Sequence, residues 1–392
     1  MTAAASDARL RISPPEVPFR EGRWFHPAVA VDARGDWIMT LQRELGCDYY
    51  SPPHVCVSPD RGRSWSAPEP IPALATRPAA DGLLEAIADV RPFFHPPSRS
   101  IIAIGCNTYY TDGGLADHGS RVADPRYPRR TVYAVRDACG RWGPRRELAA
   151  ADGPLNAIAA CTQLVIFPDG DALVPFYFNE NPETRGFHCG VSTVRCRFLD
   201  GELRVERRGE TLRHPPLRGL LEPSAALFRN RLYLTLRAED GYGYWCVGDD
   251  GLSWGPRRPW SWDDGEALAM STTQQHWLEL DGELYLAYTR RNGENGAVPR
   301  FRAPLYLCRF DTALGALARA EEREVMPLAY RGRTPGLLGN FHTAPTGGSE
   351  AVITDAPLWA SCATPPGPPD TEVWLARVTA GASGGGCEKS AG

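Results

Sequence analysis

Polar side chains recur at one place in a repeated pattern, namely at the end of the second strand of each predicted hairpin. Five of the six such strands end in an amide or an arginine: Gln42, Asn107, Asn179, Arg237 and Arg290. Amides donate and accept hydrogen bonds, and arginine binds carboxylates in a bidentate geometry. If these strands end side by side in the fold, the sequence predicts one shared polar site that is suited to an anionic or hydroxylated ligand.

Histidines are the second group of candidates. The chain has eight, and five of them lie in or beside hairpins or insertions of different repeats: His26, His95, His188, His276 and His342. Histidine changes charge near neutral pH and can act as an acid or a base, although a single one is more often a packed residue. We expect no metal ion and no cofactor, because no GxSxG, HExxH, EF-hand or phosphate-loop motif occurs.

These residues are carried by an internal repeat of an apolar strand, a tight polar turn and a second apolar strand. The copies span residues 29–42, 93–107, 164–179, 225–237, 276–290 and 343–355. Their turn markers are Gly35, Ser98, Gly170, Asn230, Gly282 and Gly348, and the steps between them are 52 to 72 residues. Six copies at this period predict an all-β, six-bladed β-propeller with four-stranded blades. A seven-bladed propeller with one diverged copy is the alternative.

The length of 392 residues fits one such domain, because each propeller blade packs on its neighbours and needs no single large core. We predict one domain over residues 1–380 and a disordered Gly/Ser-rich tail over 381–392. The segment 8–13 is expected to close the ring beside 372–378. Two insertions, 108–130 and 179–189, lie outside the repeat and are expected to build the binding face.

Charge and cysteine usage restrict the partners and the compartment. The net charge of -4 is too small to attract nucleic acid or an anionic membrane. No apolar run approaches the ~18 residues of a membrane span, and residues 1–14 lack the apolar region of a signal peptide. The eleven cysteines show no metal-binding spacing and are expected to be reduced thiols. The sequence therefore predicts a cytoplasmic protein, and it carries no signal for an oligomeric state.

Segments of the chain resemble the Asp-box, or BNR repeat, S-x-D-x-G-x-x-W, of the sialidase (neuraminidase) superfamily. Ser58, Asp60, Gly62 and Trp65 match it fully. A second segment supplies Asp249, Gly251 and Trp254, with Val247 in place of the serine, and a third keeps Asp137 and Trp142 but has Cys139 in place of the glycine. The aspartate is expected to cap a turn, the glycine to permit a positive φ and the tryptophan to pack between strands. Asp-boxes also occur in non-enzymatic propellers, so the resemblance implies the fold and not the activity.

Exo-α-sialidases add an arginine triad for the substrate carboxylate, an aspartic acid/base and a tyrosine nucleophile that a glutamate activates. The segment 220–255 resembles the family's stretch of glutamate, hairpin, arginine and Asp-box. This resemblance implies that Glu222 is the activating glutamate and Arg237 the second arginine of the triad. The segment 288–311 resembles the stretch with the third arginine, which implies Arg302, with Arg300 as runner-up.

The beginning of the chain resembles the family's opening R-I-P strand less closely. The residue two before Pro27 is Phe25 instead of an arginine, the arginine lies at position 23, and His26 precedes the proline. The resemblance implies Arg23 as the first arginine of the triad and Asp48, which lies 25 residues later, as the acid/base. In the segment 337–345, where the family has its tyrosine, the chain has Phe341 and His342.

These residues predict a glycoside hydrolase that acts on a sialic or uronic acid glycoside. Arg23, Arg237 and Arg302 would bind the carboxylate, Asp48 would be the acid, and Glu222 the base or the activator of an unidentified nucleophile. One alternative is a glycan lyase, or a propeller cleaving rhamnosyl-glucuronate linkages, that uses tyrosine and histidine such as His26 and His342. Another is a non-catalytic sugar-binding propeller, in which these side chains would be scattered. We expect at least four of the five charged residues to line one cavity at the channel mouth, with His26 or His342 within reach.

Overall fold

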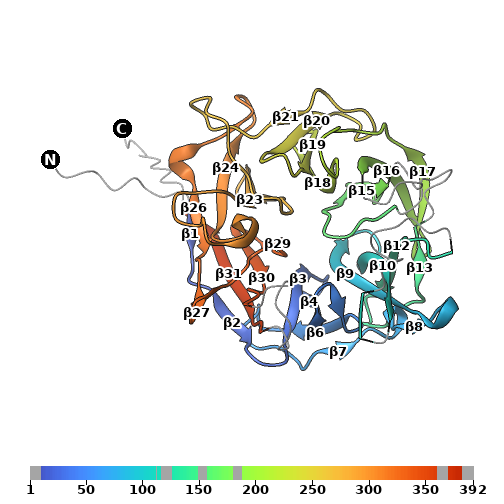
Figure 1. Ribbon diagram of the computed structural model, residues 1–392. Helices are drawn as coiled ribbons and strands as arrows, with labels where there is room; N and C mark the ends of the chain where they lie inside the picture. The colour runs from blue at the N-terminus through green and yellow to red at the C-terminus, as the bar shows by residue number, and fades with distance from the viewer. Residues whose placement is uncertain are drawn as a thin grey trace, which may run out of the picture.

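Six antiparallel sheets surround a central axis in the computed structural model, so the chain is a six-bladed β-propeller (Figure 1). The structure describes residues 10–111, 113–115, 126–148, 157–179, 188–359 and 370–381. The predicted fold class is confirmed, and the seven-bladed alternative is wrong. Among the described residues, helical structure is limited to four 3₁₀ turns: η1 Pro72–Leu74, η2 Ala80–Gly82, η3 Pro299–Phe301 and η4 Arg319–Glu321. None of the helices in these ranges is long and apolar enough to cross a membrane.

The inner half of each blade is one of the predicted hairpins, and each turn marker lies between its two strands. From blade 1 to blade 6 the hairpins are β3 (Trp24–Val31) with β4 (Trp37–Gly46), β9 (Leu84–His95) with β10 (Ser100–Thr111), β14 (Val165–Ile166) with β15 (Ala172–Asn179), β18 (Leu221–Phe228) with β19 (Arg231–Arg237), β22 (His276–Leu280) with β23 (Glu283–Thr289), and β29 (His342–Gly347) with β30 (Glu350–Asp355). The strands alternate buried apolar side chains, so neighbouring blades pack face to face.

The outer strands complete the blades. They are β6 (His54–Ser58) and β7 (Glu69–Pro70), β12 (Thr131–Arg136) and β13 (Arg146–Glu147), β16 (Cys189–Leu199) and β17 (Glu202–Arg208), β20 (Gly243–Gly248) and β21 (Arg258–Pro259), β24 (Leu305–Asp311) with β25 (Ala316–Leu317) and β26 (Arg323–Met326), and β31 (Val373–Ala380) with β1 (Leu10–Ile12). Short additions are β2 (Glu16–Phe19), β5 (Tyr49–Tyr50), β8 (Arg77–Pro78), β11 (Gly114–Leu115), and the pair β27 (Tyr330–Arg331) and β28 (Thr334–Pro335).

The N-terminal strand closes the ring. β1 pairs antiparallel with β31, with Leu10 opposite Ala380 and Ile12 opposite Val378. Blade 6 therefore takes its outermost strand from the start of the chain, which confirms the predicted closure. The predicted tail lies almost wholly outside the described residues, as do the central parts of both insertions. Residues 108–111 belong to β10 and are not loop, which corrects the start of the first insertion.

The first Asp-box segment forms a capped turn. The Asp60 carboxylate accepts hydrogen bonds from the Ser64 N–H at 2.9 Å and from the Ser58 hydroxyl at 2.8 Å. These hydrogen bonds, those from Ser64 first, lower the pKa of Asp60 to about 2. Gly62 has a φ of +80°, and a Cβ there would lie 2.7 Å from the Trp37 ring, so both the conformation and the space require glycine.

The second segment is capped differently from the prediction. Asp250 accepts the N–H groups of Leu252 and Ser253, both at 2.8 Å, whereas Asp249 lies 3.2 Å from Arg231. The capping role expected of Asp249 is wrong, because the segment has two consecutive aspartates and the second one lies beside the free N–H groups. In the third segment the aspartate does cap its turn, since Asp137 accepts two N–H groups at 2.9 Å.

A buried arginine ties the centre of the propeller together. Arg91 of β9 donates to the carbonyls of Thr162 at 3.2 Å and Thr343 at 2.8 Å, and its Nη1 lies 3.2 Å from His276 Nδ1. The same imidazole nitrogen lies 2.8 Å from the Ser224 hydroxyl. Burial lowers the pKa of Arg91 to about 9. This polar layer connects blade 2 to blades 3, 5 and 6, and the candidate site lies beside it.

Candidate functional site

The innermost segments of blades 1 to 4 each carry one chemically active residue with a left-handed backbone. These residues are His26, Asp89, Cys161 and Glu222, with φ values of +52°, +57°, +53° and +42°. In blades 1, 2 and 4 the strand pairing shifts register at this point, as in a β-bulge. A left-handed non-glycine residue costs about 1–3 kcal/mol, and such residues cluster at functional sites. The bulges turn these side chains toward one another, as their contacts show.

Glu222, Arg237 and Arg302 form the centre of the site, and we call them the inner group. Arg237 Nη1 donates to Glu222 Oε1 at 2.5 Å, and its Nε donates to the Thr272 hydroxyl at 3.2 Å. Arg302 Nη2 donates to the main-chain oxygen of Thr272 at 3.3 Å. The side chains of Arg237 and Glu222 are 6% and 16% exposed. Two arginines from blades 4 and 5 therefore meet at one threonine.

Arg302 lies in an environment that favours an anionic ligand. Burial lowers its pKa to about 10, the charges of Arg237 and Arg300 add to this effect, and Glu222 and Asp48 oppose it. Its Nε is buried and donates to no described group. Gly339 makes the room, since a Cβ at that position would lie 2.9 Å from Arg302 Cδ and Nη1. A cation that is destabilised by burial and by like charges is stabilised when an anion binds.

Asp48 is exposed and acts electrostatically on the inner group. The Arg23 side chain makes no described contact with that group. Asp48 is exposed in the turn between β4 and β5, accepts a hydrogen bond from the Tyr50 hydroxyl at 3.3 Å, and acts electrostatically on Arg302. Arg23 is half-buried, and its main-chain oxygen accepts the Glu44 N–H at 2.9 Å. Asp48 is thus linked to the inner group by its charge and by no described contact, and no described contact joins the Arg23 side chain to the inner group.

His26 is buried in a cluster with Asp89 and Cys161. His26 Nδ1 lies 2.8 Å from Asp89 Oδ1. Burial raises the pKa of Asp89, but His26, Arg129 and a hydrogen bond from Cys161 outweigh it, and the net shift is downward. Among the described residues, His26, Asp89 and Cys161 are the group with the donor types and proximity to hold a metal ion. Two ligands of one zinc ion would lie about 3.3 Å apart, so the 2.8 Å distance fits a direct hydrogen bond better.

His342 lies beside His276, with ring centroids 5.2 Å apart. Both side chains are buried, and burial, followed by the charge of Arg91, lowers the pKa of each well below its usual value. These imidazoles are therefore neutral at pH 7. Within the described chain, Nδ1 of His342 has no hydrogen-bond partner.

Asp355 is a site residue that the sequence reasoning missed. It is the last residue of β30, it is fully buried, and its Oδ1 accepts the Ala356 N–H at 2.7 Å. Burial raises the pKa of Asp355 to about 7, against opposing effects that include the charges of His26 and Arg302. The signal was present in the sequence, because Asp355 makes the sixth repeat strand end in a polar residue like the other five.

Tyr177 of β15 is the second residue that was missed. Burial raises the pKa of Tyr177, and the charge of Glu222 raises it further, while Arg129 has the opposite effect. The phenol is therefore neutral, and the Glu222 carboxylate acts on it electrostatically. Its position in an apolar strand two residues before Asn179 gave no sign of this interaction.

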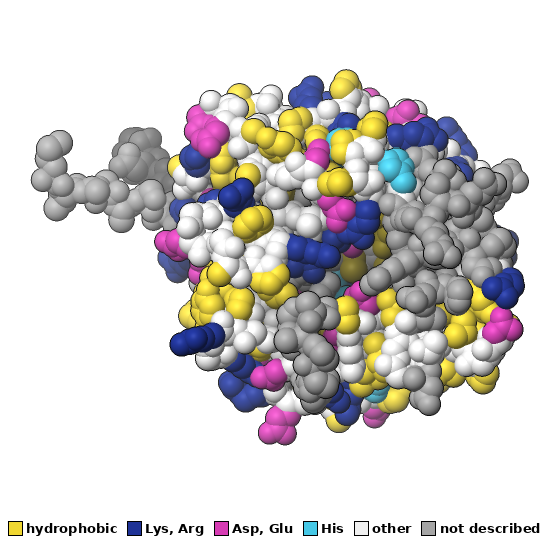
Figure 2. Space-filling view, viewed as in Figure 1, with side chains coloured by type: hydrophobic (Ala, Val, Ile, Leu, Met, Phe, Trp, Pro, Cys, Tyr) yellow, Lys and Arg dark blue, Asp and Glu magenta, His cyan; other side chains and the backbone are white. Residues whose placement is uncertain are grey.

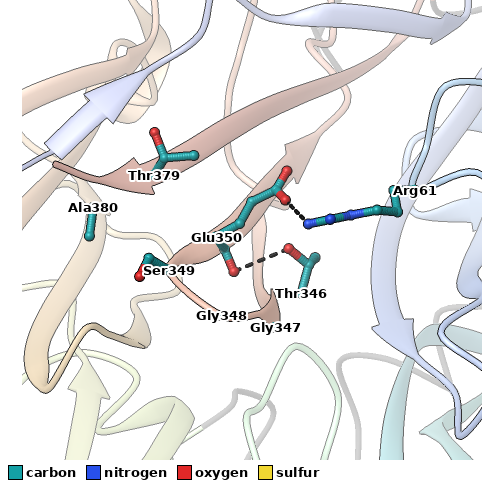
Figure 3. Close-up of a pocket in the computed structure, with 8 residues that line it drawn as sticks. All are labelled: Arg61, Thr346, Gly347, Gly348, Ser349, Glu350, Thr379 and Ala380. Atoms are coloured by element: carbon teal, nitrogen blue, oxygen red, sulfur yellow. Dashed lines mark hydrogen bonds and ion pairs between the residues drawn. The ribbon is translucent and has the colours of Figure 1, made fainter. Parts of the chain in front are cut away.

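A pocket of about 550 Å³ lies at the opposite end of the blade 6 hairpin (Figure 3). It surrounds the turn between β29 and β30, about five residues and ~16 Å along the strand from Asp355. Arg61 and Glu350 form an ion pair there, and the Thr346 hydroxyl donates to the Glu350 main-chain oxygen at 3.1 Å. Its charged groups are already paired, and it is separate from the inner group. On the face seen in Figure 2, arginine and acidic side chains gather around a central hollow.

Comparison with known proteins supports the fold and no more. No protein-family model and no curated protein matches the chain. A Dyadobacter fermentans protein of unknown function superimposes with a TM-score of 0.66 at 12% identity, covering 95% of this chain and 99% of that one. The Hadza microbial sialidase Hz136 has a TM-score of 0.62 at 12% identity, covering 92% and 68%. Trypanosoma rangeli sialidase with the inhibitor DANA has a TM-score of 0.58 at 13% identity, and the match covers 93% of this chain but only 57% of that one.

Proposed function

We propose that this protein is a glycoside hydrolase that acts on glycosides of an acidic sugar, a sialic or a uronic acid. The observation that carries the proposal is the meeting of Arg237 and Arg302 at Thr272, with Glu222 on Arg237. Paired guanidinium groups are suited to bind a sugar carboxylate with several charge-assisted hydrogen bonds. The shared fold supports the same substrate class, since Trypanosoma rangeli sialidase has been solved in complex with sialic acid.

The proposed reaction uses Asp48, Glu222 and Tyr177. Asp48 donates its proton to the glycosidic oxygen as the bond from that oxygen to the anomeric carbon breaks. The Tyr177 oxygen forms a bond to the anomeric carbon, and Glu222 takes the phenol proton, because a neutral phenol needs a base to act as a nucleophile. Water then displaces Tyr177 and gives a proton to Asp48, and the phenol regains its proton from Glu222. This sequence retains the anomeric configuration.

The lyase alternative fits the geometry less well. A lyase that uses His26 or His342 as its base needs an imidazole that reaches the sugar, and each of these residues is only 2% exposed. A non-catalytic sugar-binding propeller would use the meeting of Arg237 and Arg302 in the same way, and turnover is the property that separates it from a hydrolase. The two histidines are better suited to hold the innermost strands in place, His26 through Asp89 and His342 through its packing on His276.

The test is a liberated-sugar assay on sialyl and uronyl glycosides with Asp48→Asn, Glu222→Gln and a matched control, Asp281→Asn, at an exposed turn position. We expect the first two variants to lose a factor of about 10² or more in kcat, and the control to keep its activity. Full activity in Asp48→Asn and Glu222→Gln would refute their roles. An unsaturated product that absorbs in the ultraviolet would identify a lyase, and binding without turnover a binding module.

A further inference from the structure

A second group of charged residues, Arg218, Glu239 and Arg300, lies next to the inner group, and we call it the outer group. Arg218 Nη2 donates to Glu239 Oε1. Glu239 follows Arg237 by two residues, and Arg300 precedes Arg302 by two, so the same loops carry both groups. Arg218 is 39% exposed and Arg300 is also exposed, whereas the inner arginines are more buried.

Hydrogen bonds at Ser271 and Thr272 bring the two groups close together, and the electrostatic effects are consistent with this. The hydrogen bond from Arg218 is the largest effect that lowers the pKa of Glu239, and the charges of Arg237 and Arg300 lower it further. The charge of Arg300 also lowers the pKa of Arg302. Ser271 contacts the Arg300 main chain, and the next residue, Thr272, contacts both Arg237 and Arg302, so Arg300 lies on the turn beside the inner group. The electrostatic effects of Arg300 on Glu239 and Arg302 agree with this position.

The backbone fixes Arg300 in this position. Its φ is +55°, a left-handed conformation in a residue other than glycine. The turn is held by the Ser271 hydroxyl, which donates to the Arg300 main-chain oxygen, and by the Phe301 N–H, which donates to Val298 at 2.9 Å. The Arg300 side chain has no ion pair with any residue in the described ranges. A strained turn that presents an exposed, unpaired cation at the rim of a cleft is typical of a binding residue.

The charges of the two groups match. Each contains two arginines and one glutamate, so each has a net charge of +1. The net positive charge of the inner group suits one sugar carboxylate. The outer group has one positive charge left over for a second anion. Tyr242, which is 40% exposed and follows Glu239 by three residues, adds an aromatic face on which a sugar ring can stack.

We propose that the outer group binds the carboxylate of the neighbouring acidic sugar, so that the preferred substrate is an oligosaccharide with two consecutive acidic residues. The inner group holds the carboxylate of the residue that is cleaved, and Arg300 and Arg218 hold that of the next residue. The inference rests on the proposed function for the inner group, and it adds the class of substrate.

The experiment compares an acidic disaccharide with the same disaccharide whose second carboxylate has been reduced to an alcohol. For the wild type we expect kcat/KM to be at least about tenfold higher on the diacidic substrate, as one charge-assisted contact supplies. The preference should shrink at high salt, because the outer group is exposed. Arg300→Gln should bring the ratio of the kcat/KM values for the two disaccharides close to one. Arg291→Gln is the matched control, since Arg291 is also exposed and lies 5.2 Å over the Phe301 ring, and it should keep the wild-type ratio.

Two results would overturn the inference. One is a wild-type ratio near one, and the other is a ratio that Arg300→Gln leaves unchanged. If neither disaccharide is cleaved, the proposed function fails, and the dissociation constants of the same two disaccharides then test the outer group separately. A tenfold preference in binding that Arg300→Gln abolishes supports the outer group, and equal affinities refute it.

Discussion

Replacing Asp355 with asparagine should stabilise the protein, and by an amount that depends on pH. Asp355 is fully buried, and burial raises its pKa from 3.8 to about 7. The charges of His26 and Arg302 and the Ala356 N–H favour the ionised form but do not offset the burial. The Asp355 carboxyl ionises above pH 3.8 in the unfolded chain but stays protonated up to about pH 7 in the folded protein. The wild type therefore loses stability as the pH rises above 3.8, and the loss is complete above about 7.

The magnitude follows from the difference between the two pKa values. A shift of about three units at 1.36 kcal/mol per unit gives a cost of about 4 kcal/mol at pH 8. At pH 5 the unfolded state is ionised but the folded state is not, and the cost is about 1.7 kcal/mol. The substituted asparagine carries no charge at either pH, and its amide oxygen can still accept the Ala356 N–H. The advantage of Asp355→Asn over the wild type should therefore grow by about 2.6 kcal/mol between pH 5 and pH 8.

The measurement is urea unfolding of both proteins at pH 5 and pH 8. The comparison at each pH cancels the titration of all groups that the two proteins share. Asp60→Asn is the control with the opposite sign: hydrogen bonds lower the pKa of Asp60 to about 2, so this variant should be less stable than the wild type, and equally so at both pH values. If the advantage of Asp355→Asn is the same at pH 5 and pH 8, the reasoning about Asp355 is refuted.

Three glycine substitutions test the packing. Gly339→Ala puts a Cβ 2.9 Å from Arg302 Cδ and Nη1, so the guanidinium must move. KM for an acidic glycoside should then rise severalfold, while the melting temperature stays nearly unchanged. An unaltered KM would contradict the role of Arg302. Gly62→Ala and Gly35→Ala both force alanine into a positive φ, but only the first meets an obstacle, the Trp37 ring at 2.7 Å. Gly35→Ala should lower the free energy of unfolding by ~1 kcal/mol, and Gly62→Ala should lower it by about 1–3 kcal/mol more. Equal losses of the two variants in urea unfolding would contradict the packing argument.

The fold was predictable because its signals are local. A strand, a tight turn and a second strand can be recognised within about fifteen residues, and the turn markers from Gly35 to Gly348 all lie in the observed hairpins. The closure by β1 was expected at the right place, but no local signal in segment 8–13 required it. In the second Asp-box-like segment the motif match chose Asp249, whereas Asp250 caps the turn, because the choice depends on a hydrogen-bond geometry that residue types do not encode.

The site was predictable where one hairpin carries it, as for Glu222 and Arg237, and at Arg302, which the family resemblance implied. Glu222 and Arg237 face each other across the β18–β19 hairpin, and their pairing follows from a local register. Asp89, Tyr177 and Asp355 come from three different blades, and their importance arises from burial and from neighbours on other blades. β9 also contains Glu85, Arg91 and His95, so nothing in its sequence distinguished Asp89 from the other polar residues of the strand.

The central arginine has a consequence for how the molecule unfolds. In an array whose units contact only their neighbours, a unit at the seam can open while the others stay folded. Arg91 links blade 2 directly to blades 5 and 6, which are not its neighbours in the ring. Opening the ring at the β1–β31 seam displaces blade 6 and leaves a buried guanidinium without one of its acceptors, at a cost of several kcal/mol. Local opening of that seam is therefore coupled to the loss of the whole domain, and we expect the propeller to unfold as one cooperative unit.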